Sequence, residues 1–275
     1  MSASESRADP PSDRVLEGFG RHGRPQPLSD DHHATWRVGD LVLKPADISH
    51  EQLEWQASLQ RRLRDHDGFR MPQAVRSLDG RLLVDGWHAM TFLEGRHEPA
   101  RWPDIIAVGA VFHDAVADEP VPSFLEQRRD PWSIGDRVAW GAQASEDLPE
   151  TKHLDRLLAT LAGLDARSQL IHGDLTGNVL FDDRLPPAIL DLSPYHRPRD
   201  FASAIVVADA LVWEGADETL VRAFRADRDF PQYLVRALIY RIVTDRLFRR
   251  NEPLRADADD PYARPIDLVV ALAGG

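Results

Sequence analysis

The chain has 275 residues, of which 43% are hydrophobic, so it can build a substantial core in one large domain or in two lobes. Its formal net charge of -12 argues against nucleic acids and anionic membranes as partners, because both require clustered positive charge. The absence of cysteine excludes disulfides, thiol nucleophiles and zinc-thiolate sites. No apolar run approaches membrane-spanning length and the start of the chain lacks the apolar core of a signal peptide, so we expect a soluble cytoplasmic protein.

The first predicted elements are a short helix and a hairpin. Residues 1–14 are rich in Ser, Asp and Pro and indicate a flexible tail, and Val15 to Gly20 favours a short helix. Two extended apolar runs, 34–38 and 41–44, flank the dipeptide Gly39-Asp40. A two-residue turn of this kind between apolar runs predicts a β-hairpin.

A longer helix and a second hairpin follow. Ser49 has a glutamine three residues later, which is the spacing of a capping box, and predicts a helix that continues to about Arg64. Leu82 to Val84 and Trp87 to Phe92 flank Asp85-Gly86, again a two-residue turn.

From about Trp102 the sequence is mainly helical. Pro194 to Pro198 predicts an interruption without regular structure, and Asp200 is expected to cap the helix that follows. The helices are predicted near residues 102–116, 151–164, 200–213, 216–228, 231–250 and 266–273.

Three polar groups converge in the stretch from Leu170 to Leu192: Asp174, Asn178 and Asp191. Phosphoryl transfer needs positioning and charge neutralisation more than covalent help from the protein. A carboxylate that orients the attacking hydroxyl and accepts its proton fits Asp174, whereas an amide oxygen and a second carboxylate that hold magnesium fit Asn178 and Asp191. Asp174 or Asn178 by itself is more typical of a capped surface turn. The three together favour a phosphoryl-transfer site.

The same residues are the analogue of the protein-kinase pattern H-R-D-x-x-x-x-N with a later D-F-G, here His172-Gly173-Asp174, Asn178 and Asp191-Leu192-Ser193. The His-Gly-Asp-Leu form resembles the aminoglycoside phosphotransferase-like family, and the string as a whole looks closest to an uncharacterised branch of it. The spacing from Asp174 to Asn178 is one residue shorter than is usual there, and Gly177 can relax the backbone to compensate. His172 is expected to hold the loop.

The resemblance implies an α+β, protein-kinase-like fold with two lobes. We expect a small, mostly antiparallel sheet lobe over residues 15–92 and a helical lobe for catalysis and acceptor binding over residues 93–275. It also implies ATP and Mg²⁺ as cofactors, and backbone groups of Thr91 to Leu93 at the hinge, where they would meet adenine.

In this fold a strand lysine pairs with the phosphates of ATP and with a helix carboxylate. Lys44 ends an apolar strand and is one of only two lysines. Glu51 and Glu54, three residues apart on the next helix, are the candidate partners, although both are also typical of solvated first-turn acids. The segment from Ser29 to Thr35, which would cover the phosphates, contains no glycine and includes two acids, Asp30 and Asp31.

The sequence therefore predicts a phosphotransferase that acts on a hydroxyl of a small molecule. The negative net charge and the acids Asp257, Asp259 and Asp260 favour an acceptor that carries positive charge. The alternative is a weakly active or inactive kinase-like protein that binds nucleotide as a regulator. The sequence does not indicate the oligomeric state.

Overall fold

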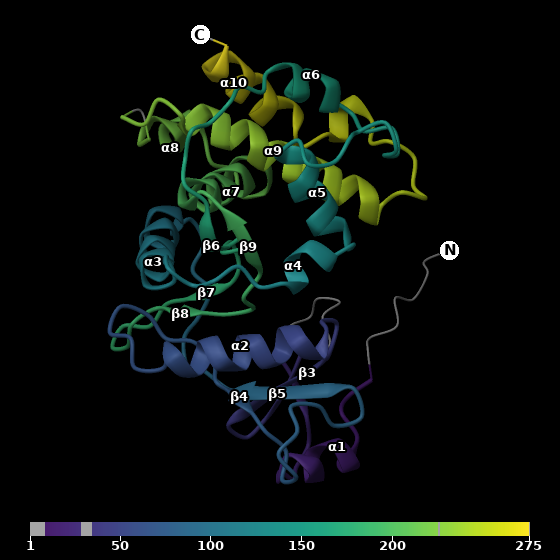
Figure 1. Cartoon of the computed structure of the whole chain (residues 1–275), viewed down its shortest axis with the longest axis vertical. Helices are drawn as coiled ribbons and strands as arrows, with labels where there is room; N and C mark the ends of the chain where they lie inside the picture. Colours follow the sequence, from purple (N-terminus) through teal and green to yellow (C-terminus); the bar gives the residue numbers. More distant parts are fainter. Residues whose placement is uncertain (1–8, 29–34, 225, 275) are drawn as a thin grey trace. The chain divides into compact units, whose positions relative to one another are not determined.

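The computed structural model describes residues 9–28, 35–224 and 226–274. The chain divides into two compact units. The N-terminal unit comprises Met1–Arg96 together with Leu180–Leu190, and the helical unit comprises His97–Val179 together with Asp191–Gly275. Figure 1 labels their elements.

The N-terminal unit contains a five-stranded antiparallel sheet in the order β1-β2-β3-β5-β4 (Figure 1). The first predicted hairpin is confirmed, whereas the second is reduced to its turn, because residues 82–84 form no strand and only Val84 bridges to Trp87. Val38 pairs with Leu41 across the first turn, and Val84 and Trp87 exchange backbone hydrogen bonds of 2.9 Å across the second. The strands are β1 (Gln26–Pro27), β2 (Trp36–Val38), β3 (Leu41–Pro45), β4 (Ala74–Val75) and β5 (Trp87–Thr91).

Two helices belong to the same unit, α1 (Asp13–Gly18) and α2 (His50–Arg62). The predicted cap of α2 is confirmed, because Ser49 Oγ accepts the N–H of Gln52 at 3.1 Å. Leu41 and Leu43 of β3 are buried in one small core with residues of α1. Since side chains alternate along a strand, Lys44 projects from the opposite face of the sheet.

The hairpin after the central loop belongs to the N-terminal unit. Strands β7 (Val179–Leu180) and β8 (Ala188–Ile189) pair with each other, and Phe181 donates its N–H to the carbonyl of Arg96 at 2.9 Å. A boundary at residue 93 would place residues 180–190 in the helical lobe, whereas in the structure they belong to the N-terminal unit. The backbone pairing of Phe181 with Arg96 joins these residues to the N-terminal unit. No local sequence pattern predicts this pairing.

The helical unit is built around α9 (Phe230–Phe248), which packs against α5, α6, α7 and α10 and is buried on most of its circumference (Figure 1). Its other helices are α3 (Trp102–Ala115), α4 (Phe124–Gln127), α5 (Pro131–Ala139), α6 (Leu154–Ala159), α7 (Arg199–Trp213), α8 (Glu218–Arg222), the 3-10 turn η1 (Asp257–Asp259) and α10 (Ala263–Ala273).

Two sequence predictions for this unit are wrong. Pro194 to Arg197 forms a strand, β9, which pairs antiparallel with β6 (Gln169–His172) in a two-stranded sheet. Proline is compatible with this strand because Pro194 is its first residue. Asp200 lies in the first turn of α7 but does not cap it, because the N-cap residue is Pro198 and no side chain bonds to the end of the helix.

Candidate active site

The loop that follows β6 begins at a buried histidine. The side chain of His172 is fully buried, and its Nδ1 accepts the backbone N–H of Asp174 at 3.1 Å. The N–H of His172 donates to Nε2 of His113, a second buried histidine, at 3.1 Å. The prediction that His172 holds the loop is confirmed, and His113 is a hydrogen-bonded interior residue, as its place in an apolar helix indicates.

Gly173 lets the loop pass against an aromatic ring. A Cβ atom at this position would lie 2.4 Å from the Cδ2 atom of Tyr195, far inside van der Waals contact, and the Tyr195 ring is itself buried. The N–H of Gly173 donates to the carbonyl of Ser193 at 2.8 Å, which continues the pairing of β6 with β9 by one residue. The loops that carry Asp174 and Asp191 therefore emerge at the same end of this two-stranded sheet.

Asp174 and Asn178 are in direct contact. Nδ2 of Asn178 donates to the backbone carbonyl of Asp174 at 2.7 Å and lies 3.3 Å from its Oδ2. The backbone closes a turn in which Asn178 donates to the carbonyl of Leu175 at 2.9 Å, with Gly177 at φ +76°. Gly177 thus adopts, within this turn, a left-handed conformation that other residues rarely take.

The other carboxylate oxygen of Asp174 binds an arginine that sequence analysis missed. Nη2 of Arg241, on α9, lies 2.7 Å from Oδ1 of Asp174 and 2.6 Å from Oδ2 of Asp209, on α7. Burial raises the pKa of Asp209, and the charge and the hydrogen bonds of Arg241 oppose that shift. Burial also works against the charge of Arg241, yet Asp209 and Asp174 raise the pKa of its guanidinium above the usual range.

Asp191 is exposed and lies directly after the β7-β8 hairpin. Its φ of +41° is in the left-handed region, which a residue other than glycine rarely adopts. Such backbone conformations concentrate at functional sites. Across the described ranges, no three His, Cys, Asp or Glu side chains form a metal site by themselves.

Two of the predicted nucleotide-binding residues, Lys44 and Glu54, have defined positions in the N-terminal unit. Lys44 is half-buried at the end of β3, opposite His88 of β5. Glu54 of α2 binds Arg76 through both carboxylate oxygens, at 3.1 and 2.7 Å, and this contact lowers the pKa of Glu54. Glu51 is one turn nearer the start of α2 and is exposed.

The predicted hinge begins at the last residue of β5. The N–H of Thr91 already donates to the carbonyl of Gln73 at 2.9 Å, and the N–H of Phe92 donates to the carbonyl of Asp40 at 2.8 Å. Leu93 follows at the point where the strand has ended. Of the predicted phosphate-covering loop, residues 29–34, including Asp30 and Asp31, lie outside the described residues.

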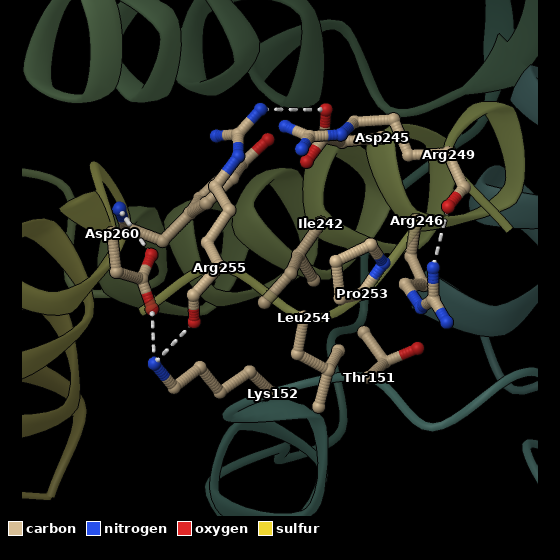
Figure 2. A pocket seen from close by; sticks show the side chains of 11 residues that line it. Thr151, Lys152, Ile242, Asp245, Arg246, Arg249, Pro253, Leu254, Arg255 and Asp260 are labelled. Atoms are coloured by element: carbon tan, nitrogen blue, oxygen red, sulfur yellow. Dashed lines mark hydrogen bonds and ion pairs between the residues drawn. The ribbon is translucent and has the colours of Figure 1, made fainter. Parts of the chain in front are cut away.

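The acids near residue 257 have partners of their own. Asp260 lies 2.9 Å from Nε2 of His153 and 3.5 Å from Nζ of Lys152, which also binds Asp257. Lys152 and Asp260 border a cavity of about 50 Å³ beside the C-terminal half of α9, where Arg255 reaches Asp245 at 3.3 Å (Figure 2). Four basic and two acidic side chains line this cavity, so its lining does not favour a cation.

The chain matches a family profile described as "Phosphotransferase enzyme family" over residues 25–234. No curated protein matches the chain. Within the described residues, no helix is both long enough and apolar enough to cross a membrane.

Solved structures with the same fold share little sequence with the chain. An aminoglycoside phosphotransferase from Alicyclobacillus acidocaldarius is 16% identical, with a TM-score of 0.58, and the match covers 98% of this chain and 96% of that one. The amicoumacin kinase hAmiN, in complex with AMP-PNP and Ca²⁺, is 12% identical, with a TM-score of 0.60 and coverage of 91% and 88%. A microcompartment-associated aminopropanol kinase is 17% identical, with a TM-score of 0.58 and coverage of 94% and 92%. The predicted protein-kinase-like fold is confirmed.

Proposed function

Because the chain belongs to the phosphotransferase enzyme family, we propose that it transfers the γ-phosphoryl group of ATP to a hydroxyl of a small molecule, with magnesium bound to the nucleotide. Family membership confirms the predicted enzyme class. The observation that carries the proposal is the geometry of the loop after β6, where a half-exposed carboxylate, Asp174, is held on both of its oxygens and by its backbone N–H.

Asp174 is the proposed catalytic residue. In the reaction the acceptor oxygen forms a bond to the γ-phosphorus atom, the bond from that atom to the β–γ bridging oxygen breaks, and ADP leaves with the electron pair. The proton of the hydroxyl passes to the carboxylate of Asp174. Orientation of the hydroxyl is the larger contribution, because the transition state of phosphoryl transfer is loose and needs little covalent help.

Asn178 and Asp191 are the proposed ligands of magnesium. The amide nitrogen of Asn178 makes both hydrogen bonds to Asp174, so the amide oxygen is the atom available to a cation. Asp191 adds an exposed carboxylate at the same end of the β6-β9 sheet. Magnesium usually takes one or two protein carboxylates and fills its shell with water and phosphate oxygens, so this donor set fits it. When bound, magnesium would neutralise charge that develops on the phosphates.

The N-terminal unit supplies the proposed nucleotide contacts. Lys44 would bind phosphate oxygens, with Glu51 or Glu54 as its carboxylate partner; of the two, Glu54 also binds Arg76. At the hinge, Leu93 offers its backbone to adenine more readily than Thr91, whose N–H is used by Gln73. The AMP-PNP and Ca²⁺ in the amicoumacin kinase support a nucleotide and a divalent cation as ligands of this fold.

The acceptor is proposed as a class only, a small molecule with a free hydroxyl. A positively charged acceptor retains the support of the net charge of -12. Asp257 and Asp260 give it none, because Lys152 and His153 bind them.

Isothermal calorimetry with ATP and magnesium, followed by a screen of hydroxyl-bearing metabolites for phosphorylated products, tests the proposal. We expect measurable ATP binding and a phosphorylated product from at least one acceptor. ATP binding with neither phosphorylation of an acceptor nor hydrolysis of ATP would favour the nucleotide-binding regulator. Failure to bind at millimolar ATP with magnesium would contradict both functions.

A further inference from the structure

Arg241 connects the loop after β6 to the core of the helical unit. Its side chain is only 8% exposed, and its guanidinium contacts two carboxylates, that of Asp174 and that of Asp209, which is 2% exposed. We propose that Arg241 is a positioning residue that sets the orientation of the Asp174 carboxylate, with Asp209 as the counter-charge that fixes Arg241. This inference rests on the proposed catalytic role of Asp174.

The guanidinium is fixed by a two-point contact. Nε of Arg241 donates to Oδ1 of Asp209 at 2.7 Å, and Nη2 donates to Oδ2 of the same residue at 2.6 Å. A bidentate pair of this kind sets the plane of the guanidinium as well as its position. The Nη2 group then has a defined direction in which it donates to Oδ1 of Asp174 at 2.7 Å.

The surroundings of Arg241 restrict it further. Its guanidinium carbon lies 5.0 Å from the centre of the Tyr240 ring and 5.9 Å from that of Trp213, within reach of cation–π contact. Tyr262 donates its hydroxyl to the backbone carbonyl of Arg241 at 3.4 Å. A side chain with these neighbours has few rotamers left, so it can serve as a rigid support.

Asp174 is held from three directions in consequence. Arg241 binds Oδ1, the amide of Asn178 lies 3.3 Å from Oδ2, and His172 binds the backbone N–H. Reaction rates depend strongly on the geometry of the catalytic group, and a displacement of about 1 Å can cost about a hundredfold. A carboxylate that is more than one-third exposed would otherwise sample several orientations in water.

A structural ion pair alone would not require this arrangement. Asp209 by itself neutralises Arg241, and Asp174, which is 37% exposed, can be hydrated without a cationic partner. Burial of a charged pair is costly, and apolar residues of similar size are often as stable. The additional bond to Asp174 is what an apolar replacement could not supply.

The test is to replace the buried pair as a unit. Arg241→Met with Asp209→Leu removes both buried charges together, which avoids the uncompensated charge that a single substitution would leave. The matched control is Arg197→Met with Asp136→Leu, which removes another bidentate pair, at 2.9 and 2.5 Å, in which Asp136 is buried and Arg197 half-buried, and which does not contact Asp174, Asn178 or Asp191. Both double variants are expected to unfold cooperatively near the melting temperature of the wild type.

In the Arg241 and Asp209 double variant, kcat should fall about ten- to a hundredfold, the range expected for one hydrogen bond between charged groups, with little change in the KM for ATP. Amide hydrogen exchange of residues 173–178 should accelerate. In the control, kcat and exchange of this loop should stay at wild-type values. Arg241→Lys keeps a charge for Asp209 but loses the planar fork, and it should show the same two effects if the double variant does not fold.

A combination with Asp174→Asn separates positioning from an independent role. Because Arg241 is proposed to act through Asp174, its replacement should cost little further turnover in an Asp174→Asn background. Wild-type kcat and wild-type loop exchange in the Arg241 and Asp209 double variant would overturn the inference, as would a full additional loss in the Asp174→Asn background. A wild-type protein without phosphotransfer would refute the proposed function, while hydrogen exchange of the loop would still decide whether Arg241 positions Asp174.

Discussion

The backbone N–H of Asp174 donates to Nδ1 of the buried His172 at 3.1 Å. The histidine two residues before the proposed catalytic carboxylate thus fixes the chain that carries it, while its own N–H is anchored on His113. The relationship gives His172 a role in the geometry of the loop, while the proposed proton acceptor is Asp174.

Two substitutions of His172 test this role, because one keeps the hydrogen-bond acceptor and the other keeps the ring. His172→Asn retains an oxygen near the position of Nδ1, whereas His172→Phe retains the ring volume and removes the acceptor. We expect His172→Asn to keep more of the wild-type kcat than His172→Phe, because the N–H of Asp174 keeps a partner. Steady-state kinetics on folded variants measure this, and a higher kcat for the phenylalanine variant would contradict it.

Gly173→Ala tests the close approach of the loop to Tyr195. The added Cβ would lie 2.4 Å from the ring, so the loop or the buried tyrosine must move, and we expect a loss of about 1–3 kcal/mol in unfolding free energy together with reduced turnover. Gly163→Ala is the matched control, because a Cβ there meets nothing within 4 Å, and its effect should stay within about 0.5 kcal/mol. Equal stability of the two variants in urea unfolding would show that the contact is not restrictive.

Because His113 is buried, we expect the folded protein to lose stability in acid. Burial, with the nearby charges of His172 and Arg199, lowers the pKa of His113 to about 3 in the folded protein, against about 6.5 for an unperturbed histidine. Above pH 6.5 neither state binds the proton, and between pH 6.5 and 3 only the unfolded state does, so stability falls as the pH falls. His113→Gln keeps an acceptor for the N–H of His172 and does not titrate.

The wild type should therefore lose about 2 kcal/mol more than His113→Gln between pH 6.5 and pH 5. Urea unfolding of both proteins at the two pH values gives this difference directly. Identical losses in the two proteins would mean that His113 accepts a proton in the folded state as easily as in the unfolded one.

Asp191→Ala tests the proposed metal ligand. It removes the charged member of the Asn178 and Asp191 set, so the extra thermal stabilisation that magnesium gives to the ATP complex should largely disappear. Asn178→Ala, which removes a neutral ligand and the bond to Asp174, should reduce it less. A full magnesium-dependent shift in Asp191→Ala would place the metal elsewhere.

Local sequence patterns sufficed for the first hairpin, for the turn at Asp85-Gly86, for the capped helix α2 and for the loop with Asp174 and Asn178, because turn residues and spacing act over a few positions. They failed at β9, where two prolines indicate irregular chain but the pairing with β6 forms a strand. Arg241 was missed for a related reason. Its partner Asp174 is 67 residues away, and only the packing of α9 brings the two together.

A signal for Arg241 was nevertheless present in the sequence. Arg241 lies between Tyr240 and Ile242 in an apolar helix, and Asp209 lies between alanines in another. Buried charges are almost always paired, so an acid within the apolar part of α7 and a base within that of α9 are candidate partners, although α9 also carries Arg236, a second buried arginine. The sequence could not indicate that Asp174 would share the same guanidinium.

The central claim, that Asp174 is the catalytic carboxylate of a phosphotransferase, is tested most directly by kcat of Asp174→Asn on the first acceptor that the wild type phosphorylates, with ATP binding measured in parallel. The substitution keeps the shape of the side chain and removes its ability to accept a proton. We predict a fall in kcat of about 10²- to 10⁴-fold with ATP affinity close to that of the wild type. A variant that binds ATP and turns over at the wild-type rate would contradict the account.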